Sequence, residues 1–226
     1  MPPESASMFH VKHPQEEEPA YGASEFQAQL EVSDDQMADL RAFGDLLFEW
    51  NDKMNLVGPS AQADFWRRHV LDSAQLLALA PDALTFADLG AGAGFPGLVL
   101  ACLLKGRAGA QVHLVESMAK RCRFLTAVVT ALSLPATVHN ARAEDLRLRV
   151  DVVTARACAP MVRLLGYAES YLKQDAVGLF LKGQDVEPEL NEAAKTWRFD
   201  ARLQPSLSHP QGRIVALQRA TRVRPA

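Results

Sequence analysis

Hydrophobic residues in the first third of the chain recur at helical spacing. Ser33 and Gln36 form a capping-box pattern, which marks the start of a helix. Apolar residues then follow at steps of three and four, as on one face of a helix: Met37, Leu40, Phe43, Leu47, Trp50 and Met54. The pattern predicts a helix that begins after Ser33 and reaches about residue 54. A second helix is expected from Gln62 to Leu79, where Pro81 ends it.

From residue 84 onward, short apolar runs alternate with helical segments. Such alternation is typical of a parallel sheet that helices cover on both faces. Residues 201–207 and 213–218 predict two final strands, and the short turn between them requires antiparallel pairing. The other expected strands span residues 85–89, 112–115, 137–138, 151–154 and 176–181, and the expected helices span residues 96–104, 118–132, 161–172 and 187–197.

The stretch FADLGAGAGFPG, residues 86–97, joins a predicted strand to a predicted helix through glycines 90, 92, 94 and 97. Glycine adopts backbone angles that other residues avoid, and without a Cβ it lets a ligand approach the main chain. The free N–H groups at the start of the new helix face the same loop. We therefore expect this loop to bind a ligand.

Two cofactors are compatible with the glycine loop. Gly92, Gly94 and Gly97 match the dinucleotide pattern G-x-G-x-x-G, and Glu116 ends the next apolar run. The other candidate is S-adenosylmethionine, whose amino-acid end would use residues 90–94 while a carboxylate holds its ribose. A parallel sheet that finishes in an antiparallel hairpin is typical of class I methyltransferases, whereas dinucleotide folds stay parallel. The hairpin therefore favours S-adenosylmethionine.

Composition narrows the functional classes. With 226 residues, of which 48% are hydrophobic and 23% charged, the chain can form one globular domain with a sizeable core. No apolar run approaches the ~20 residues that span a bilayer, and the N-terminus has no signal pattern, so we expect a cytoplasmic protein. Cys102, Cys122 and Cys158 are scattered, which favours free thiols and gives no support to a metal site.

Charge is distributed unevenly along the chain. Residues 1–35 contain eight acidic residues and one lysine, a net charge of −7. Residues 36–226 contain 19 acidic and 23 basic residues, a net charge of +4, which is compatible with a nucleic-acid substrate. We expect residues 1–24 to form a flexible acidic tail, residues 25–82 to form helices packed on the core, and residues 83–226 to form the core itself.

Several short blocks share the pattern of one known family. The most specific are Arg68–Ser73 (RHVLDS), the glycine loop, Arg156 after the fourth strand, and Leu181–Gln184 (LKGQ). Together they resemble the RsmG (GidB) family, bacterial methyltransferases that modify N7 of one guanine in small-subunit ribosomal RNA. Further matching blocks are Asn55-Leu56, Glu116-Ser117, Lys120-Arg121, Arg123–Leu125, Ala141–Glu144 and Ala155–Ala157.

The resemblance implies an α/β fold, that of a Rossmann-like class I S-adenosylmethionine-dependent methyltransferase. It would have a mostly parallel seven-stranded sheet, a C-terminal antiparallel hairpin and an N-terminal helical extension. Glu116 would accept hydrogen bonds from the ribose hydroxyls, at a position where many family members have aspartate. The residues that the resemblance assigns to the cofactor are Asp88, Gly90, Gly92, Gly94, Phe95, Glu116, Ala143, Glu144 and Arg156.

Arg156 has a second expected task, which is to position the target guanine or its phosphate. No general base is expected, because N7 of guanine carries a lone pair and no hydrogen. Some of the other assignments have structural alternatives: Asp88 as a brace for the loop, Phe95 as a core residue, and Glu144 as a helix-start acid. His69 and Asp72 lie three residues apart on one helix face, where we expect them to brace the helices against the glycine loop.

The implied partner is 16S ribosomal RNA in the small ribosomal subunit, with no membrane or DNA partner and a monomeric protein. Alternative functions are a methyltransferase of the same fold with another acceptor, an NAD-dependent oxidoreductase, and a non-catalytic cofactor-binding module. The oxidoreductase would need a hydride-handling side chain, which the sequence does not reveal. The expected contacts to RNA phosphates are the basic residues Arg67, Arg68, Lys120, Arg121, Arg123, Arg163 and Lys182.

Overall fold

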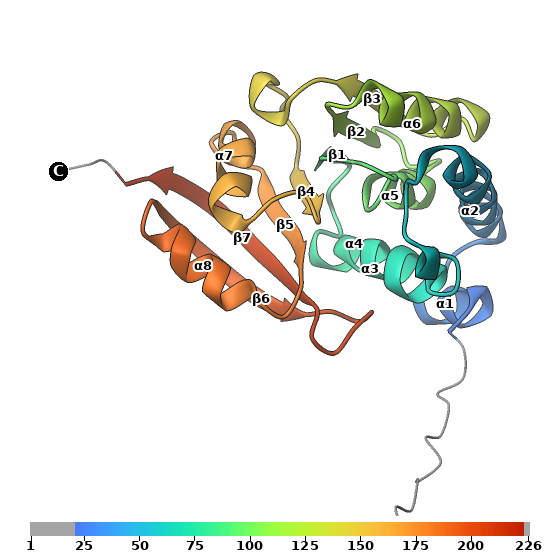
Figure 1. Cartoon of the computed structure of the whole chain (residues 1–226), viewed down its shortest axis with the longest axis horizontal. Helices are drawn as coiled ribbons and strands as arrows, with labels where there is room; N and C mark the ends of the chain where they lie inside the picture. Colours follow the sequence, from blue (N-terminus) through green and yellow to red (C-terminus); the bar gives the residue numbers. More distant parts are fainter. Residues whose placement is uncertain (1–20, 224–226) are drawn as a thin grey trace, which may run out of the picture.

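A seven-stranded sheet forms the centre of the structure (Figure 1). Its strands are β1 (Thr85–Leu89), β2 (Gln111–Glu116), β3 (Ala136–Asn140), β4 (Val152–Arg156), β5 (Val177–Lys182), β6 (Trp197–Pro205) and β7 (Arg213–Arg222), in the order β3-β2-β1-β4-β5-β7-β6. The pairs from β3 to β5 are parallel, whereas β7 runs antiparallel to both β5 and β6. This computed structural model describes residues 21–223, and it confirms the mostly parallel sheet with a C-terminal hairpin.

Helical segments cover both faces of this sheet. They are α1 (Ala23–Leu30), α2 (Asp34–Met54), η1 (Pro59–Ala61), η2 (Phe65–Leu71), α3 (Asp72–Ala74), α4 (Leu76–Leu79), α5 (Gly97–Leu104), α6 (Ala119–Ala131), η3 (Ala143–Asp145), α7 (Met161–Leu172) and α8 (Val186–Ala194). On β1, Phe86 joins the hydrophobic cluster of α2, α5 and α6, whereas Ala87 and Leu89 join that of α7 and α8. The division follows from the alternation of side chains along a strand. Within residues 21–223, no helix has the length and hydrophobicity needed to span a membrane.

Helix α2 begins with the capping box that the sequence predicts. The Gln36 backbone N–H donates to Ser33 Oγ at 3.3 Å, and the Ser33 N–H donates back to Gln36 Oε1 at 3.1 Å. The buried face of α2 includes Phe43, whose ring lies 5.3 Å from that of Phe95 in the glycine loop. The N-terminal helices therefore share one hydrophobic cluster with the sheet and its glycine loop.

The boundary predicted for the flexible tail, residue 24, is too late, because α1 already begins at Ala23. The Gly22 N–H donates to Glu25 Oε2 at 2.9 Å, and Phe26 is fully buried with its ring 5.6 Å from that of Trp66. A short helix with a single buried residue gives no hydrophobic periodicity, so the sequence pattern does not reveal it. The rest of the predicted tail, residues 1–20, lies outside the described residues.

The single helix expected from Gln62 to Leu79 is also wrong, because the segment divides into η2, α3 and α4. The first of these pieces, η2, is a π-helix. Ser73 Oγ donates to the carbonyl of His69 at 2.7 Å, and Gln75 Nε2 donates to the carbonyl of Asp72 at 3.0 Å. Side chains that bond to nearby carbonyls compete with the regular helical ladder, which explains the division.

Two boundaries near the C-terminus also differ from the prediction. Helix α8 ends at Ala194 and β6 begins at Trp197, which had been expected to end the helix. Trp197 is buried and pairs with Arg222 across the hairpin. The guanidinium of Arg222 lies 4.6 Å from the centre of the Trp197 ring. Pairing between strands thus decides this boundary, and it also extends β7 to Arg222 instead of residue 218.

Candidate functional site

The carboxyl ends of the parallel strands form one edge of the sheet, where open α/β sheets bind their ligands. Two cavities lie there: a pocket of about 270 Å³ beside the ends of β1 and β2, and a cleft of about 950 Å³ beside β4, β5 and the hairpin turn. We call them the small pocket and the cleft. Both are lined by Ala157 and Cys158, so they meet at the turn that follows β4.

The glycine loop lines the small pocket with backbone. Gly90 has a φ of +71°, and a Cβ at this position would lie 2.7 Å from Cys158 Sγ. Gly97 has no room for a side chain either, because its Cβ would collide with Leu114 and approach Asp88 Oδ2 at 2.7 Å. The first glycine leaves bare main chain at the pocket, and the second lets α5 pack closely on the sheet.

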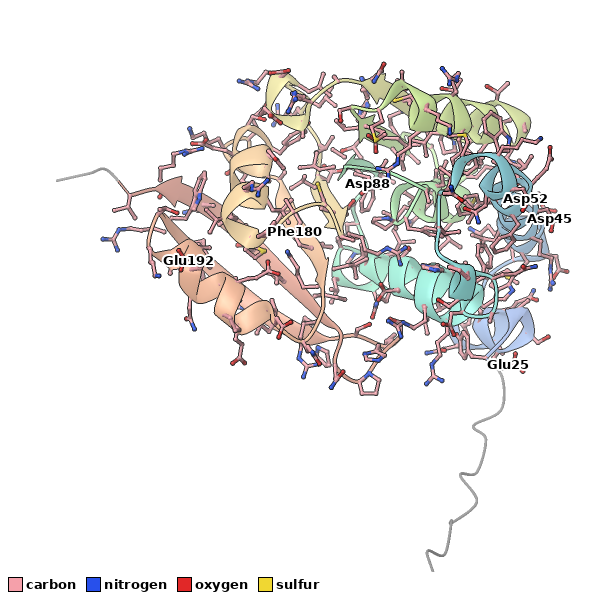
Figure 2. All side chains as sticks on the ribbon, viewed as in Figure 1. Glu25, Asp45, Asp52, Asp88, Phe180 and Glu192 are labelled. Carbon is pink, nitrogen blue, oxygen red and sulfur yellow. The ribbon has the colours of Figure 1, made fainter. Side chains whose placement is uncertain are left out.

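Asp88 acts as the brace of this loop. It is fully buried near the middle of the molecule, unlike the peripheral Glu25 and Asp45 (Figure 2). Its carboxylate accepts hydrogen bonds from the Gly97 N–H at 2.9 Å and from Thr154 Oγ1 at 3.2 Å. Burial raises the pKa of Asp88 to about 7, although these hydrogen bonds oppose the rise. Of the two alternatives, the geometry supports bracing over direct contact with a cofactor.

Glu116 ends β2 and presents its carboxylate to the small pocket. It is only 4% exposed, and its two oxygens accept the N–H groups of Gly92 at 3.1 Å and of Met118 at 2.8 Å. Arg121 lies 3.7 Å from the same carboxylate. Because each carboxylate oxygen has two lone pairs, Glu116 keeps acceptor capacity for a ligand.

The other cofactor candidates divide between the lining and its support. Ala143 and Glu144, in η3, line the small pocket with Gly90 and Glu116. Gly92 donates to Glu116 and Gly94 is buried. Phe95 is 4% exposed and packs against rings of the N-terminal helices, as the core alternative expects.

Arg156, at the end of β4, lies in the cleft and is held on several sides. Its guanidinium donates to the carbonyl of Arg68 at 2.9 Å and to Nδ1 of His69 at 2.8 Å, and it lies 4.8 Å over the ring of Phe95. Burial lowers the pKa of Arg156 from its ordinary value, while Asp72 and Asp88 oppose that effect. Its position is therefore set by the N-terminal helices as much as by β4.

His69 braces the helices against the glycine loop, as expected, whereas Asp72 bonds to the C-terminal hairpin instead; both residues also hold Arg156. The imidazole of His69 stacks on Phe95 at 4.8 Å, and burial, together with Arg156 and Arg68, lowers the pKa of His69 to about 4. Asp72 Oδ2 lies 3.8 Å from Arg156. A neutral His69 that accepts from Arg156 is suited to holding the guanidinium in place.

A polar network joins Asp72 to the C-terminal hairpin, which the sequence analysis missed. Asp72 Oδ1 accepts hydrogen bonds from Gln75 Nε2 at 2.9 Å, Ser206 Oγ at 3.0 Å and Ser208 Oγ at 2.6 Å. Ser208 and the neighbouring His209 line the cleft. No sequence signal identifies these serines, since they lie more than 130 residues from Asp72.

The expected RNA-contacting residues have different environments. Arg68 lines the cleft and Arg121 lines the small pocket, whereas Lys120, Arg123 and Arg163 are exposed on α6 and α7. The guanidinium of Arg67 lies 5.9 Å from the centre of the Tyr21 ring.

Lys182 lies in the cleft, yet it is engaged within the protein. Its ammonium donates to the carbonyl of Ala159 at 2.8 Å and pairs with Glu189 at 2.7 Å, and its side chain is 10% exposed. It therefore holds the turn after β4 against α8. Phosphate binding by Lys182 would require this pair to break.

The lining residues of the small pocket that were not predicted include Met118 and Tyr167. Met118 is 52% exposed, and Tyr167 reaches the pocket from α7. Only Met118 had a local signal, a large apolar residue just after the strand that ends in Glu116. The three cysteines, Cys102, Cys122 and Cys158, are free thiols, as expected.

Solved structures support the methyltransferase fold. A mutant form of MtNAS, crystallised in complex with S-adenosylmethionine, aligns with a TM-score of 0.56 at 15% identity, over 88% of this chain and 84% of that one. A putative O-methyltransferase from Klebsiella pneumoniae aligns with a TM-score of 0.55 at 13% identity, over 87% of this chain and 96% of that one. At such identities the likeness concerns the fold alone.

Sequence comparisons are more specific. The family model for GidB, rRNA small subunit methyltransferase G, matches residues 36–215. Ribosomal RNA small subunit methyltransferase G of Caulobacter vibrioides is 64% identical over 202 residues, which is 89% of this chain and 94% of the relative. The protein of that name from Bradyrhizobium sp. is 50% identical over 176 residues, 76% of this chain and 79% of the relative. The chain therefore belongs to the GidB family of rRNA small subunit methyltransferases.

Proposed function

We propose that the protein transfers a methyl group from S-adenosylmethionine to N7 of a guanine in 16S ribosomal RNA. The observation that carries the proposal is the junction at Ala157 and Cys158, where the small pocket meets the cleft that contains Arg156. A cofactor in the pocket and a base in the cleft would face each other there. Family membership supports ribosomal RNA as the acceptor. The protein would act as a cytoplasmic monomer on the small subunit, without a membrane or DNA partner.

The small pocket fits the nucleoside part of S-adenosylmethionine. Glu116 has free lone pairs for the two ribose hydroxyls, and the exposed Met118 and nearby Ala143 offer apolar surface to an adenine ring. Gly90 has no side chain, so it would present its main chain to the cofactor's amino-acid end. When bound, this cofactor supplies an electrophilic methyl group on its sulfonium sulfur.

Arg156 would orient the acceptor base. A guanidinium has five N–H donors, and the carbonyl of Arg68 and Nδ1 of His69 occupy two of them. The guanidinium also faces Asp72 Oδ2 at 3.8 Å, and its remaining donors would bind O6 of a guanine or its phosphate. Because the guanidinium is already fixed by its protein contacts, little further ordering is needed when the base enters.

The arrangement suits an acceptor atom that needs no deprotonation. His69 is the imidazole nearest to Arg156, and its Nδ1 already accepts from that guanidinium. Asp72 accepts three hydrogen bonds through Oδ1. Neither group is free to remove a proton from a substrate, whereas N7 of guanine reacts through its existing lone pair. The rate would then depend on alignment of the nucleophile with the methyl carbon.

The direct test is methyl transfer from labelled S-adenosylmethionine to small ribosomal subunits from a strain that lacks this modification. We expect label on a single guanine, with cleavage chemistry specific for N7-methylguanine mapping the methyl to N7. Arg107→Ala, which removes an exposed arginine outside both cavities, is the matched control for Arg156→Ala. Label on another atom would contradict N7 as the acceptor.

Cofactor choice is tested separately by calorimetry with S-adenosylmethionine and NAD. Binding of S-adenosylmethionine alone is expected. Binding without transfer to any ribosomal RNA would contradict the RNA acceptor and favour a methyltransferase that acts on another substrate. Binding of NAD in its place would overturn the cofactor assignment.

A further inference from the structure

The C-terminal hairpin concentrates positive charge. Residues 197–223 contain five arginines and one acidic residue, although the whole chain has a net charge of −3. Two of the arginines have contacts within the hairpin region: Arg213 donates to the carbonyl of Pro210 at 2.8 Å, and Arg222 packs on Trp197. The other three are exposed, and within residues 21–223 none of them has an ion pair or a side-chain hydrogen bond: Arg198, Arg202 and Arg219.

The strand register places these three arginines together. Arg202 pairs with Ala216, which packs against the cluster of α2 and α5, whereas Trp197 and Phe199 belong to the cluster of α7 and α8. Arg198, four residues from Arg202, pairs with the exposed Thr221. Arg198 and Arg202 therefore project from the face of the hairpin that α7 and α8 leave uncovered.

A β-bulge brings the third arginine to the same area. Phe199 pairs with Ala220 and Ala201 pairs with Leu217, so Asp200 faces two residues of β7, Gln218 and Arg219. Both are exposed. We call this surface the hairpin face, and it consists of Arg198, Asp200, Arg202, Gln204, Gln218, Arg219 and Thr221.

The hairpin face continues from the wall of the cleft. The turn after β6 contributes Ser208, His209 and Gln211 to the cleft lining. At ~3.3 Å per strand residue, Arg202 lies ~13 Å and Arg198 ~26 Å beyond Ser206, along a line that leads away from the cleft. Figure 1 shows β6 and β7 forming one end of the molecule beside this turn.

Charged residues on an edge strand prevent pairing with other chains, and Arg198 and Arg202 lie on β6, the edge strand of the sheet. Arg219 lies on β7 beyond Leu217, where pairing with β5 has ended and only β6 continues beside it. Protection of these strand edges and binding of an anionic ligand both agree with the three arginines, and the salt dependence of RNA binding distinguishes them.

We propose that the hairpin face binds the phosphate backbone of ribosomal RNA next to the target nucleotide. The inference rests on the proposed function and adds the surface on which the RNA lies. Unpaired arginines bind phosphate oxygens, and exposed glutamine and threonine side chains donate further hydrogen bonds to phosphate and sugar. Such contacts supply affinity and register, while Arg156 acts on the base itself.

The test compares two triple variants with the same change of net charge. The first carries Arg198→Gln, Arg202→Gln and Arg219→Gln. The control carries Lys53→Gln, Arg107→Gln and Arg149→Gln, three exposed residues outside the hairpin and outside both cavities. For the first variant we expect KM for unmodified small subunits to rise about tenfold, with affinity for S-adenosylmethionine unchanged. We also expect the slope of log Kd against the logarithm of the salt concentration, measured for binding to 16S RNA, to decrease by about 2–3.

An equal, small effect of both triple variants on KM and on the salt slope would overturn the inference. So would a hairpin-face variant that loses binding to anionic phospholipid vesicles and keeps its affinity for RNA. Failure of the proposed function gives a different result, because the wild-type protein would then transfer no methyl to ribosomal RNA. Wild-type transfer together with an unaffected hairpin-face variant would contradict this inference alone.

Discussion

The small pocket and the cleft are assembled differently. The pocket takes most of its lining from the ends of β1, β2 and β3 and from the residues that closely follow them, and Ala157, Cys158 and Tyr167 complete it. The cleft combines residues 60–72, the turn after β4, the end of β5 with α8, and the hairpin turn, which are far apart in the sequence. Changes in the pocket should therefore alter cofactor affinity, and changes in the cleft should alter methyl transfer at saturating cofactor.

Gly90→Ala tests the small pocket. The added Cβ would lie 2.7 Å from Cys158 Sγ, in a backbone conformation that favours glycine. We expect affinity for S-adenosylmethionine to fall about 30-fold, equivalent to about 2 kcal/mol of overpacking. Gly106→Ala is the matched control, since Gly106 also has a positive φ, +84°, but has nothing within 4 Å of the added atom.

Calorimetry of both variants measures this effect, and Cys158→Ala sharpens it. If crowding against the thiol is the cause, Cys158→Ala should restore part of the affinity in the Gly90→Ala background. Equal losses in Gly90→Ala and Gly106→Ala would show that backbone strain alone is responsible.

Asp72→Ala tests the cleft. The substitution removes the carboxylate beside Arg156 and leaves Ser206 and Ser208 without their acceptor. We expect kcat to fall about tenfold while affinity for S-adenosylmethionine stays within about twofold, because the pocket is built from other elements. Steady-state kinetics and calorimetry measure the two quantities, and Asp72→Asn should recover part of kcat. Loss of stability with kcat intact would assign Asp72 a structural role only.

Asp88 predicts a loss of stability as the pH rises. Its carboxyl keeps its proton up to about pH 7 in the folded protein, whereas it ionises near 3.8 when unfolded. Folding therefore takes up a proton between these values, so the free energy of unfolding should fall by about 1.3 kcal/mol between pH 5 and pH 6. Urea unfolding of the wild type and of Asp88→Asn at several pH values isolates the contribution of Asp88 to this pH dependence. Parallel pH profiles of the two proteins would contradict a buried protonated Asp88.

His69 predicts a smaller change of opposite sign. Its pKa is lowered to about 4 in the folded protein, against an ordinary value of 6.5. The unfolded chain therefore binds the proton more readily, and the wild type should lose about 1 kcal/mol between pH 6.5 and pH 5.5. His69→Gln, which keeps an acceptor but does not titrate, should not show this loss in urea unfolding. A similar loss in both proteins would exclude His69 as its source.

The sequence predicted the parts that depend on local chemistry. Strand β1 and helix α7 match the predicted bounds, because a strong apolar run or stripe defines each. The glycine loop and Glu116 lie where expected, since the ends of parallel strands meet at one edge. For Asp88 and Phe95 the sequence left two roles open, and burial favours the structural one in both.

The rest depends on contacts between distant segments. The bonds from Ser206 and Ser208 to Asp72 join residues more than 130 positions apart. Tyr167 belongs to α7, and it reaches the small pocket only because α7 packs on one face of the sheet. The start of β6 at Trp197 is likewise set by pairing with β7. None of these contacts leaves a periodic or spaced pattern in a single sequence.

The most direct test of the account compares Glu116→Ala with Arg156→Ala in the same two assays. We expect Glu116→Ala to weaken binding of S-adenosylmethionine about 100-fold, because two backbone N–H groups and the ribose lose their acceptor. Arg156→Ala should bind the cofactor normally and transfer methyl to small subunits at least about 100-fold more slowly at saturation. If Arg156→Ala instead weakened cofactor binding and regained full turnover at high cofactor concentration, the assignment of Arg156 to the acceptor base would be wrong.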